Sequence, residues 1–443
     1  MKKIELLLPA GDYQKMKFAY AFGADATYLG IPRFSLRARE NGFKKGTEIE
    51  AIDYAHNLDK KVYLTANIIP HNHKVEPFMN YVDDLLTQAQ PDAWIMSDPG
   101  MIMMMKEKHP EQEIHLSVQA NSVNYASARF WESMGVNRII LSREISIKEI
   151  KQIRDYCPNL ELEAFVHGSI CIAYSGRCLI SNYMSYRDPN QGTCSHSCRW
   201  EYKMYEKEEL QPADWLAEAN PKDVAITQHE DEYVPLKKDY YLEESERPGE
   251  FLQIDEDENG TYLMNARDLC AIEHLDALKE AGIDSLKVEG RSKSVYYTAV
   301  IARAYRNALQ DLNEGKSFNE KHLNEVFSTS HRGLIAGFLF GNPGKSAQKF
   351  DQAKPEKSSH QFSGIVHEYD AEKGLLKVEP RNPIRKGMSL ELLTLEDTIT
   401  FTVENVFTDK YKPIDVIHGG LHYCYIPYAQ NPGEFALLRE KLI

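Results

Sequence analysis

Four of the seven cysteines in this 443-residue chain lie in one segment, between residues 171 and 198. Their spacing is C-x6-C-x15-C-x3-C, at Cys171, Cys178, Cys194 and Cys198. Thiolates gathered in one loop are soft ligands, typical of zinc sites and of iron–sulfur clusters. Zinc sites usually have paired C-x2-C arms, which this segment lacks. The longer gaps therefore favour an iron–sulfur cluster, with zinc as the alternative.

The clustered cysteines could also serve the fold without any metal. Buried free cysteines behave as small hydrophobic residues, but ordinary packing does not account for four of them in one segment. Two disulfides would fit a secreted protein. However, Glu5 interrupts the short apolar run at residues 4–8, which favours a buried first strand over a signal peptide. We therefore expect a cytoplasmic protein with reduced thiols.

Short apolar segments alternate with amphipathic helical segments in the first part of the chain. Eight strands are predicted, at residues 4–8, 26–29, 62–66, 93–96, 114–120, 138–141, 160–166 and 285–288. Each strand precedes a predicted helix, at residues 15–22, 48–58, 76–89, 100–108, 125–134, 147–156, 269–281 and 296–312. This repetition predicts an α/β fold, a (β/α)8 barrel of the TIM type. Other α/β architectures remain the alternative.

Polar and apolar residues alternate within several of these strands, so each strand has a polar face. The polar sets are Tyr63, Thr65 and Asn67; His115, Ser117, Gln119 and Asn121; Glu161, Glu163, Phe165 and His167; and Lys287 and Glu289. Because the outer face of a barrel packs against helices, these sets should point into the lumen. They could form a functional polar mouth, or a satisfied core network such as Glu163 with Lys287.

The cysteine segment follows the seventh strand, at the end of the barrel where active sites of such folds lie. We therefore expect the metal over the barrel mouth, facing residues at the carboxyl ends of several strands. The candidate catalytic residues there are Asn67, Gln119, His167 and Glu289, with Arg291 nearby. A nucleophilic Cys171 beside His167 is conceivable, but it would leave the other three cysteines without a role.

The chain is expected to contain two domains. The barrel should span residues 1–340, with an acidic insertion at about 201–260. Residues 341–359 resemble a linker. Residues 360–443 then carry short alternating strands, at 362–369, 374–379, 388–393, 398–406 and 423–426, which predict a small β-barrel domain.

Charge and missing motifs exclude several classes of function. The net charge of −14 fits poorly with indiscriminate nucleic-acid binding, although basic residues between 33 and 61 could form a local patch. No apolar run is long enough to span a membrane. The chain has no HExxH, G-x-S-x-G or Walker A motif, so a serine or zinc hydrolase has little support.

Several motifs resemble those of one family. The start, Leu7-Leu-Pro-Ala-Gly-Asp12 with Gly23-Ala-Asp-Ala-Thr-Tyr-Leu-Gly30, is similar to the opening of the collagenase-like peptidases of unknown catalytic type. The segments from Glu163 to Cys178, from Arg187 to Trp200, and Lys287-Val-Glu-Gly-Arg291 resemble its signatures. The most similar branch is that of the prephenate-dependent tRNA hydroxylases, which form 5-hydroxyuridine at the wobble position. The resemblance covers nearly the whole chain.

The resemblance implies a [4Fe-4S] cluster, prephenate and tRNA. The cluster would be bound by Cys171, Cys178 and Cys194, and its fourth ligand would be Cys198, or Cys270 in place of Cys198. Prephenate, an anionic dicarboxylate, would supply the hydroxyl group. Three arginines are candidates to bind its carboxylates: Arg143, Arg177 and Arg291. Iron–sulfur assembly proteins are possible partners. The alternatives are a collagenase-like peptidase dependent on a metal or cysteine, and a non-catalytic cluster scaffold.

Overall fold

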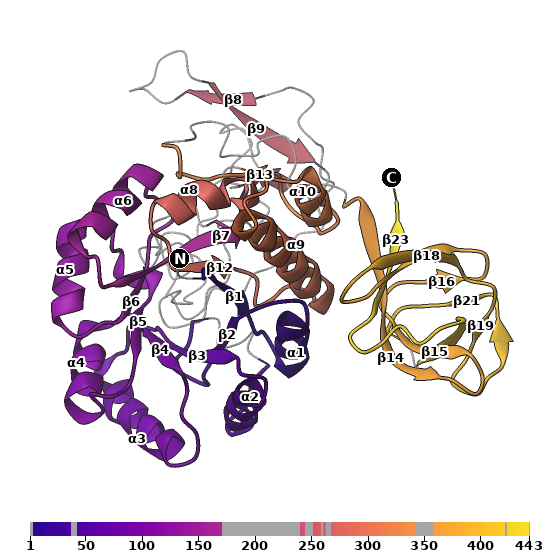
Figure 1. Ribbon diagram of the computed structural model, residues 1–443, viewed down its shortest axis with the longest axis horizontal. Helices are drawn as coiled ribbons and strands as arrows, with labels where there is room; N and C mark the ends of the chain where they lie inside the picture. The colour runs from indigo at the N-terminus through magenta and orange to yellow at the C-terminus, as the bar shows by residue number, and fades with distance from the viewer. Residues whose placement is uncertain are drawn as a thin grey trace, which may run out of the picture.

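The computed structural model describes residues 3–36, 42–170, 267–341, 343, 358–420 and 423–442 (Figure 1). It also gives the backbone of an antiparallel sheet formed by β8 (Tyr240–Glu243), β9 (Phe251–Asp257) and β10 (Gly260–Tyr262). Most of the predicted insertion and linker lies outside the described residues. So do Arg177 and the four clustered cysteines.

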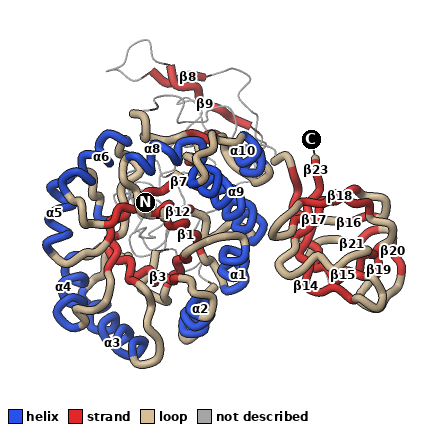
Figure 2. Tube along the Cα trace, viewed as in Figure 1, coloured by secondary structure: helices blue, strands red, loops and turns tan. Residues whose placement is uncertain are grey.

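Eight parallel strands form a closed barrel, which confirms the predicted TIM-like fold (Figures 1 and 2). The strands are β1 (Glu5–Pro9), β2 (Ala26–Gly30), β3 (Lys61–Ala66), β4 (Ala93–Met96), β5 (Ile114–Leu116), β6 (Arg138–Ile140), β7 (Glu161–Gly168) and β12 (Ser285–Val288). Each pairs with the next, and β12 closes the ring by pairing with both β7 and β1.

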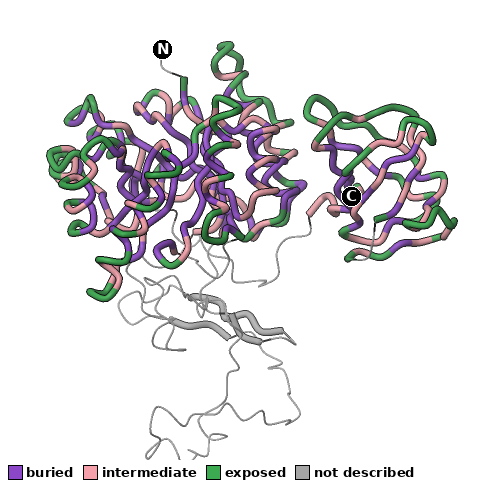
Figure 3. The backbone as a smooth tube through the Cα atoms, turned by 90° about the horizontal axis from the view of Figure 1, so that it is seen from below, coloured by how far each residue is buried: buried purple, intermediate pink, exposed green. Residues whose placement is uncertain are grey.

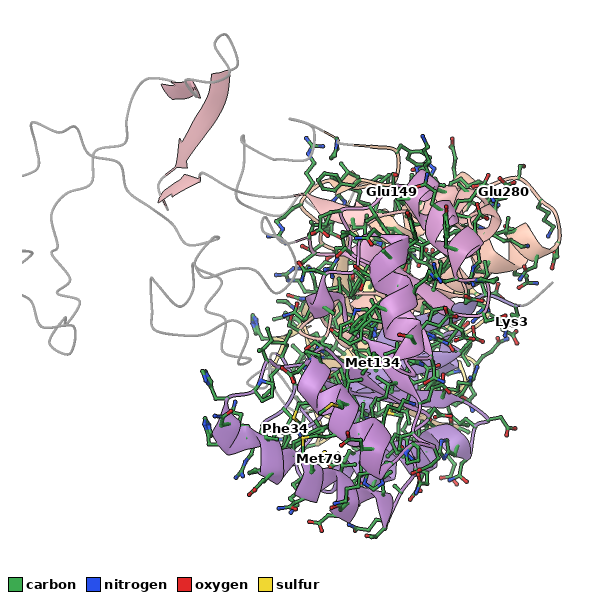
Figure 4. All side chains as sticks on the ribbon, turned by 90° about the vertical axis from the view of Figure 1, so that its left-hand side faces the viewer. Lys3, Phe34, Met79, Met134, Glu149 and Glu280 are labelled. Atoms are coloured by element: carbon green, nitrogen blue, oxygen red, sulfur yellow. The ribbon has the colours of Figure 1, made fainter. Side chains whose placement is uncertain are left out.

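Helices surround the barrel. They are α1 (Tyr13–Ala21), α2 (Thr47–His56), α3 (Val75–Leu86), α4 (Pro99–Lys108), α5 (Tyr125–Ser133), α6 (Ile147–Tyr156), α8 (Leu275–Glu280), α9 (Val295–Asn313) and α10 (Glu320–Phe327). Side-chain caps define many of their starts. In α6, Ser146 and Glu149 form a reciprocal capping box, and Glu149 lies on the outside of the molecule (Figure 4).

One predicted helix begins later than expected. Residues 269–281 were predicted to be helical, but β11 (Asp268–Cys270) comes first, followed by a 3-10 turn and α8. β11 runs antiparallel to the end of β7 and pairs with β13 (Leu334–Ile335). Its side chains point to two faces. Cys270 packs in the outer core, between the strands and the helices, whereas Leu269 packs inside the barrel. We call the buried residues inside the barrel the lumen cluster: Leu7, Ala26, Tyr28, Tyr63, Ala93, Ile95, Ile140, Phe165 and Leu269. A short apolar run does not reveal this arrangement.

An ion-pair network fills the lumen near the amino-terminal ends of the strands. The Arg138 guanidinium donates to Glu5 at 2.6 Å, to Glu161 at 2.6 Å and to Glu163 at 3.0 Å. Lys287 Nζ donates to the other oxygen of Glu163 at 2.8 Å. The alternative of a satisfied core network is therefore correct for this part of the barrel. Figure 3 shows that the strands and inner helix faces are buried, while the outer faces are exposed.

The C-terminal domain is an antiparallel sheet of eight strands with a two-stranded ribbon. Its strands are β14 (His360–Asp370), β15 (Leu375–Pro380), β16 (Ile384–Arg385), β17 (Ser389–Leu393), β18 (Thr398–Thr402), β19 (Val406–Phe407), β20 (Pro413–Ile414), β21 (Val416–Ile417), β22 (Cys424–Pro427) and β23 (Leu437–Lys441). The predicted strand at 398–406 is divided into β18 and β19. The sheet curls beside α9 (Figure 1).

Buried polar contacts join this sheet to the barrel helices. Arg439 donates to Glu391 in its own domain at 2.7 Å and to Glu325 of α10 at 3.0 Å. Tyr296 of α9 stacks on Phe362, with ring centroids 5.2 Å apart. The two domains therefore share an ordered interface.

Replacing Arg439 with methionine should weaken this interface by about 3 kcal/mol, because two carboxylates lose a buried partner. Calorimetry should then show the C-terminal domain melting in a separate, earlier transition. The exposed Arg385, changed to methionine, is the matched control. A single unshifted transition in the Arg439 variant would show that the pair does not couple the domains.

Candidate active site at the barrel mouth

The mouth is formed by the carboxyl ends of the strands and the loops that follow them. Asn67, just after β3, is held by two contacts, since its Oδ1 accepts from the Leu36 backbone N–H at 3.1 Å and its Nδ2 donates to Ser117 Oγ at 3.2 Å. These contacts tie the loop after β2 to the end of β5. Asn67 lies at the mouth as predicted, and its contacts orient neighbouring loops.

Glu289 and Arg291 follow β12, and Arg291 contacts the same loop after β2 that Asn67 holds. Glu289 Oε2 accepts from the Tyr28 hydroxyl at 3.3 Å, and its side chain is half-buried. The buried Arg291 guanidinium donates to Ser35 Oγ at 3.0 Å and to the Leu36 carbonyl at 2.6 Å. Arg291 therefore holds the loop after β2, which is a structural use of its charge.

His167 does not point into the lumen, so its predicted face is wrong. The pairing of β7 with β12 shifts by one residue, with Phe165 opposite Lys287 and His167 opposite Val288. This bulge turns the imidazole outward, between Tyr297 and Tyr305 of α9. Burial lowers the pKa of His167 to about 3, against the opposing effect of Asp268, so the ring is neutral near pH 7.

Cys270 lies on the same outer side of β7 as His167. Its Sγ is 3.8 Å from the Tyr305 hydroxyl, and the thiol is buried. Burial raises the pKa of this thiol to about 11. Its surroundings favour packing over metal ligation, while the role of fourth cluster ligand remains a prediction for Cys198.

Gln119 was predicted to lie on a strand, but it lies in a turn after the strand. Strand β5 ends at Leu116, and a 3-10 turn (Val118–Ala120) follows, so strand alternation does not extend to Gln119. The Gln119 carbonyl accepts from Asn121 Nδ2 at 2.8 Å. Within the described part of the chain, its half-exposed side-chain amide has no partner. That amide is available to a ligand.

Arg143 is the described candidate arginine whose charge is available at the mouth. Its guanidinium lies 3.7 Å from the centre of the Phe165 ring, which belongs to the lumen cluster. No described residue accepts a hydrogen bond from it. The Arg143 guanidinium and the Phe165 ring therefore form a cationic, aromatic surface at the end of β6 and β7.

Sequence reasoning missed three polar residues near Arg143. Ser142 Oγ, Glu144 Oε2 and Arg267 Nε are buried, and none has a hydrogen-bond partner within the described residues. The signal for Ser142 was its alternation with Arg138 and Ile140, both of which face the lumen. Arg267 could not be placed, because the strand that follows it was predicted to be a helix.

The cysteine segment begins at this mouth. Ile170, the last described residue before it, packs against the lumen cluster, and Cys171 is the next residue in the chain. At Gly168 the backbone has φ of +106°, and a Cβ there would lie 2.4 Å from the Glu289 carbonyl oxygen, so only glycine fits this turn. Among the described residues, no group of His, Cys, Asp or Glu side chains is placed to hold a metal.

Known families match both domains. The model of peptidase family U32 matches residues 11–349, and that of the U32 C-terminal domain matches residues 358–439. The chain belongs to peptidase family U32. The resemblance seen in its motifs is thereby confirmed. Within its described residues, no helix of this U32 protein is long and apolar enough to cross a membrane.

Several relatives of this U32 protein carry names that refer to RNA hydroxylation. The chain is 42% identical to tRNA hydroxylation protein P of Haemophilus influenzae, covering 100% of this chain and 97% of the relative. It is 43% identical to the Escherichia coli protein of the same name, covering 97% and 95%. It is 28% identical to the Escherichia coli 23S rRNA 5-hydroxycytidine C2501 synthase, covering 93% and 56%.

Proposed function

We propose that this protein is a tRNA-modifying hydroxylase that forms 5-hydroxyuridine at the wobble uridine, with prephenate as the hydroxyl donor. The observation that carries the proposal is the 42–43% identity, over nearly the full length of both chains, to proteins named for tRNA hydroxylation. The likeness to an rRNA hydroxycytidine synthase supports the same class of reaction on an RNA base.

We further propose that Cys171, Cys178, Cys194 and Cys198 hold a [4Fe-4S] cluster. Four thiolates suit such a cluster, and the segment leaves the barrel beside buried polar atoms that lack partners, as a ligand site would require. When bound, the cluster would supply electron transfer or a Lewis-acidic iron. Loading it would involve iron–sulfur assembly proteins.

The residues of the chain itself would bind and shield the reactants. The ion-pair network fills the lumen near the start of the strands, so the reaction would take place near their carboxyl ends, beside Phe165. A wobble base sits in a single-stranded loop and can be unstacked into such a mouth. The Arg143 guanidinium offers a planar cationic surface beside it.

Nucleoside mass spectrometry of tRNA tests the proposal. A strain that lacks the gene should lose 5-hydroxyuridine, and the wild-type gene should restore it. Anaerobically purified protein should be brown and contain about four irons per chain. If the modified base persists in the deletion strain and the purified protein cleaves gelatin without a cluster, the peptidase alternative is correct. Iron without any change in tRNA would favour a scaffold.

A further inference from the structure

Two buried polar atoms without hydrogen-bond partners among the described residues, Ser142 Oγ and Arg267 Nε, flank the end of β7. Ser142, in the loop after β6, is 4% exposed, and its Oγ has no hydrogen-bond partner among the described residues. Arg267, just before β11, is half-buried, and its Nε likewise has none there. Leaving such atoms unpaired in the interior costs free energy, and a bound ligand would remove that cost.

The ends of β6 and β11 place both residues at the mouth. Ser142 comes two residues after Ile140, which is the last residue of β6 and packs in the lumen cluster. Arg267 shares a face with Leu269, which packs in the lumen cluster. β6 and β11 both pair with β7, so the two residues lie on either side of its carboxyl end. We call Ser142, Arg143 and Arg267 the mouth recess.

We propose that the mouth recess binds a carboxylate group of the small-molecule hydroxyl donor, an assignment of the ligand that rests on the proposed function. The recess offers two guanidinium groups and one hydroxyl donor. Guanidinium groups bind carboxylates through paired, charge-assisted hydrogen bonds. The Phe165 ring beneath Arg143 would orient one of them.

The other arginines of the barrel interior and mouth support this assignment by contrast. Arg138 donates to three carboxylates, Arg291 to Ser35 and Leu36, and Arg332 to Asp268 and Ser169. Their charges are already used within the chain. Among the described residues, Arg143 and Arg267 have no such acceptor, so their charge is left for a ligand.

Depth favours a small carboxylate over an RNA phosphate. The Ser142 hydroxyl and Arg267 Nε have almost no contact with solvent. Backbone phosphates lie on the outside of a folded RNA, whereas a small anion can enter a recess of this kind. The chemistry of both anions is the same, so the experiment has to separate them.

Glu144 would determine which way round a ligand binds in the mouth recess. Its Oε2 is buried in the same loop without a partner among the described residues. A carboxylate at this position repels a second carboxylate but accepts a hydrogen bond from a hydroxyl group. The donor would therefore bind with a carboxylate toward Arg267 and its hydroxyl group toward Glu144.

Calorimetric titration of prephenate into anaerobic, cluster-loaded protein tests the recess. Arg267→Ala should weaken prephenate binding by about 10- to 100-fold, the range for lost hydrogen bonds to a charged group. Ser142→Ala should weaken it less, and Arg267→Lys should restore part of the affinity. Arg129, exposed on α5, is the matched control, and Arg129→Ala should bind as the wild type does.

A parallel titration with RNA shows whether the recess binds the carboxylate of the small molecule or a phosphate of the RNA. Binding of an anticodon stem-loop should be nearly unchanged in Arg267→Ala. If the stem-loop loses affinity while prephenate does not, or if neither changes, the proposal is overturned. If wild-type protein binds prephenate through Arg267 but cells show no dependence of 5-hydroxyuridine on the gene, the recess stands and the proposed reaction fails.

The role of Glu144 is tested with phenylpyruvate, a monocarboxylate that lacks both the ring hydroxyl group and the ring carboxylate of prephenate. Wild-type protein should prefer prephenate, and Glu144→Gln should reduce that preference without loss of iron. An unchanged ratio of the two dissociation constants would remove Glu144 from the recess.

Discussion

Replacing Cys171 with alanine is expected to remove the iron and to abolish 5-hydroxyuridine in complemented cells. Loss of one of four thiolate ligands weakens the binding of a cluster, and Cys171 directly follows Ile170 at the barrel mouth. Iron analysis of anaerobic protein and mass spectrometry of tRNA measure the two effects. A variant that keeps full iron and full modification would contradict both the cluster and its place in the reaction.

Cys270 provides the matched control for this result. Its thiol packs against Tyr305 on the outer side of β7, so Cys270→Ala should keep its iron, whereas Cys198→Ala should lose it. The reverse outcome would make Cys270 the fourth ligand. It would also require β11 to rearrange around the cluster, because Cys270 pairs with His167 in the structure.

The second large effect is expected at Arg138. Arg138→Met should destabilise the barrel by about 3–5 kcal/mol, because it removes the buried cation that Glu5, Glu161 and Glu163 share. The midpoint of chemical denaturation measures this loss. Arg129→Met, on the exposed face of α5, should change it little. A native-like midpoint for the Arg138 variant would show that water or Lys287 compensates for the charge.

Acid should weaken the same network. Burial on its own raises the pKa of Glu163, but Lys287 and Arg138 outweigh it and lower the pKa from 4.5 to about 2. A carboxylate with a depressed pKa stabilises the fold above its unfolded-state pKa. That contribution should be lost as pH falls from about 4.5 through 2, which denaturation curves at several pH values would reveal.

Periodicity was enough to predict the barrel, because buried parallel strands followed by amphipathic helices repeat clearly. It offered a Glu163–Lys287 pair only as the alternative to a functional polar mouth, and the structure contains that pair. It failed for His167, because a one-residue shift in strand pairing turns a side chain to the other face, and nothing in the local sequence marks that shift. It failed for Gln119 because the strand ends early and a 3-10 turn follows.

The choice among arginines shows a different limit. Arg143 and Arg291 look equivalent in the sequence, since both follow barrel strands. Only the structure reveals that the Arg291 guanidinium donates hydrogen bonds to Ser35 and Leu36, while the Arg143 guanidinium lies over the Phe165 ring. Arg267 was missed because it precedes β11, whose three residues are too few for a period to be recognised.

The ion-pair network at the amino-terminal end of the barrel affects the order in which reactants bind and products leave. A barrel sealed at one end has a single opening, so both reactants must enter and both products must leave on the same side. A large RNA seated there would obstruct a small molecule beneath it. The proposed reaction should therefore be sequential, with the small donor bound first and its remnant released only after the RNA has departed.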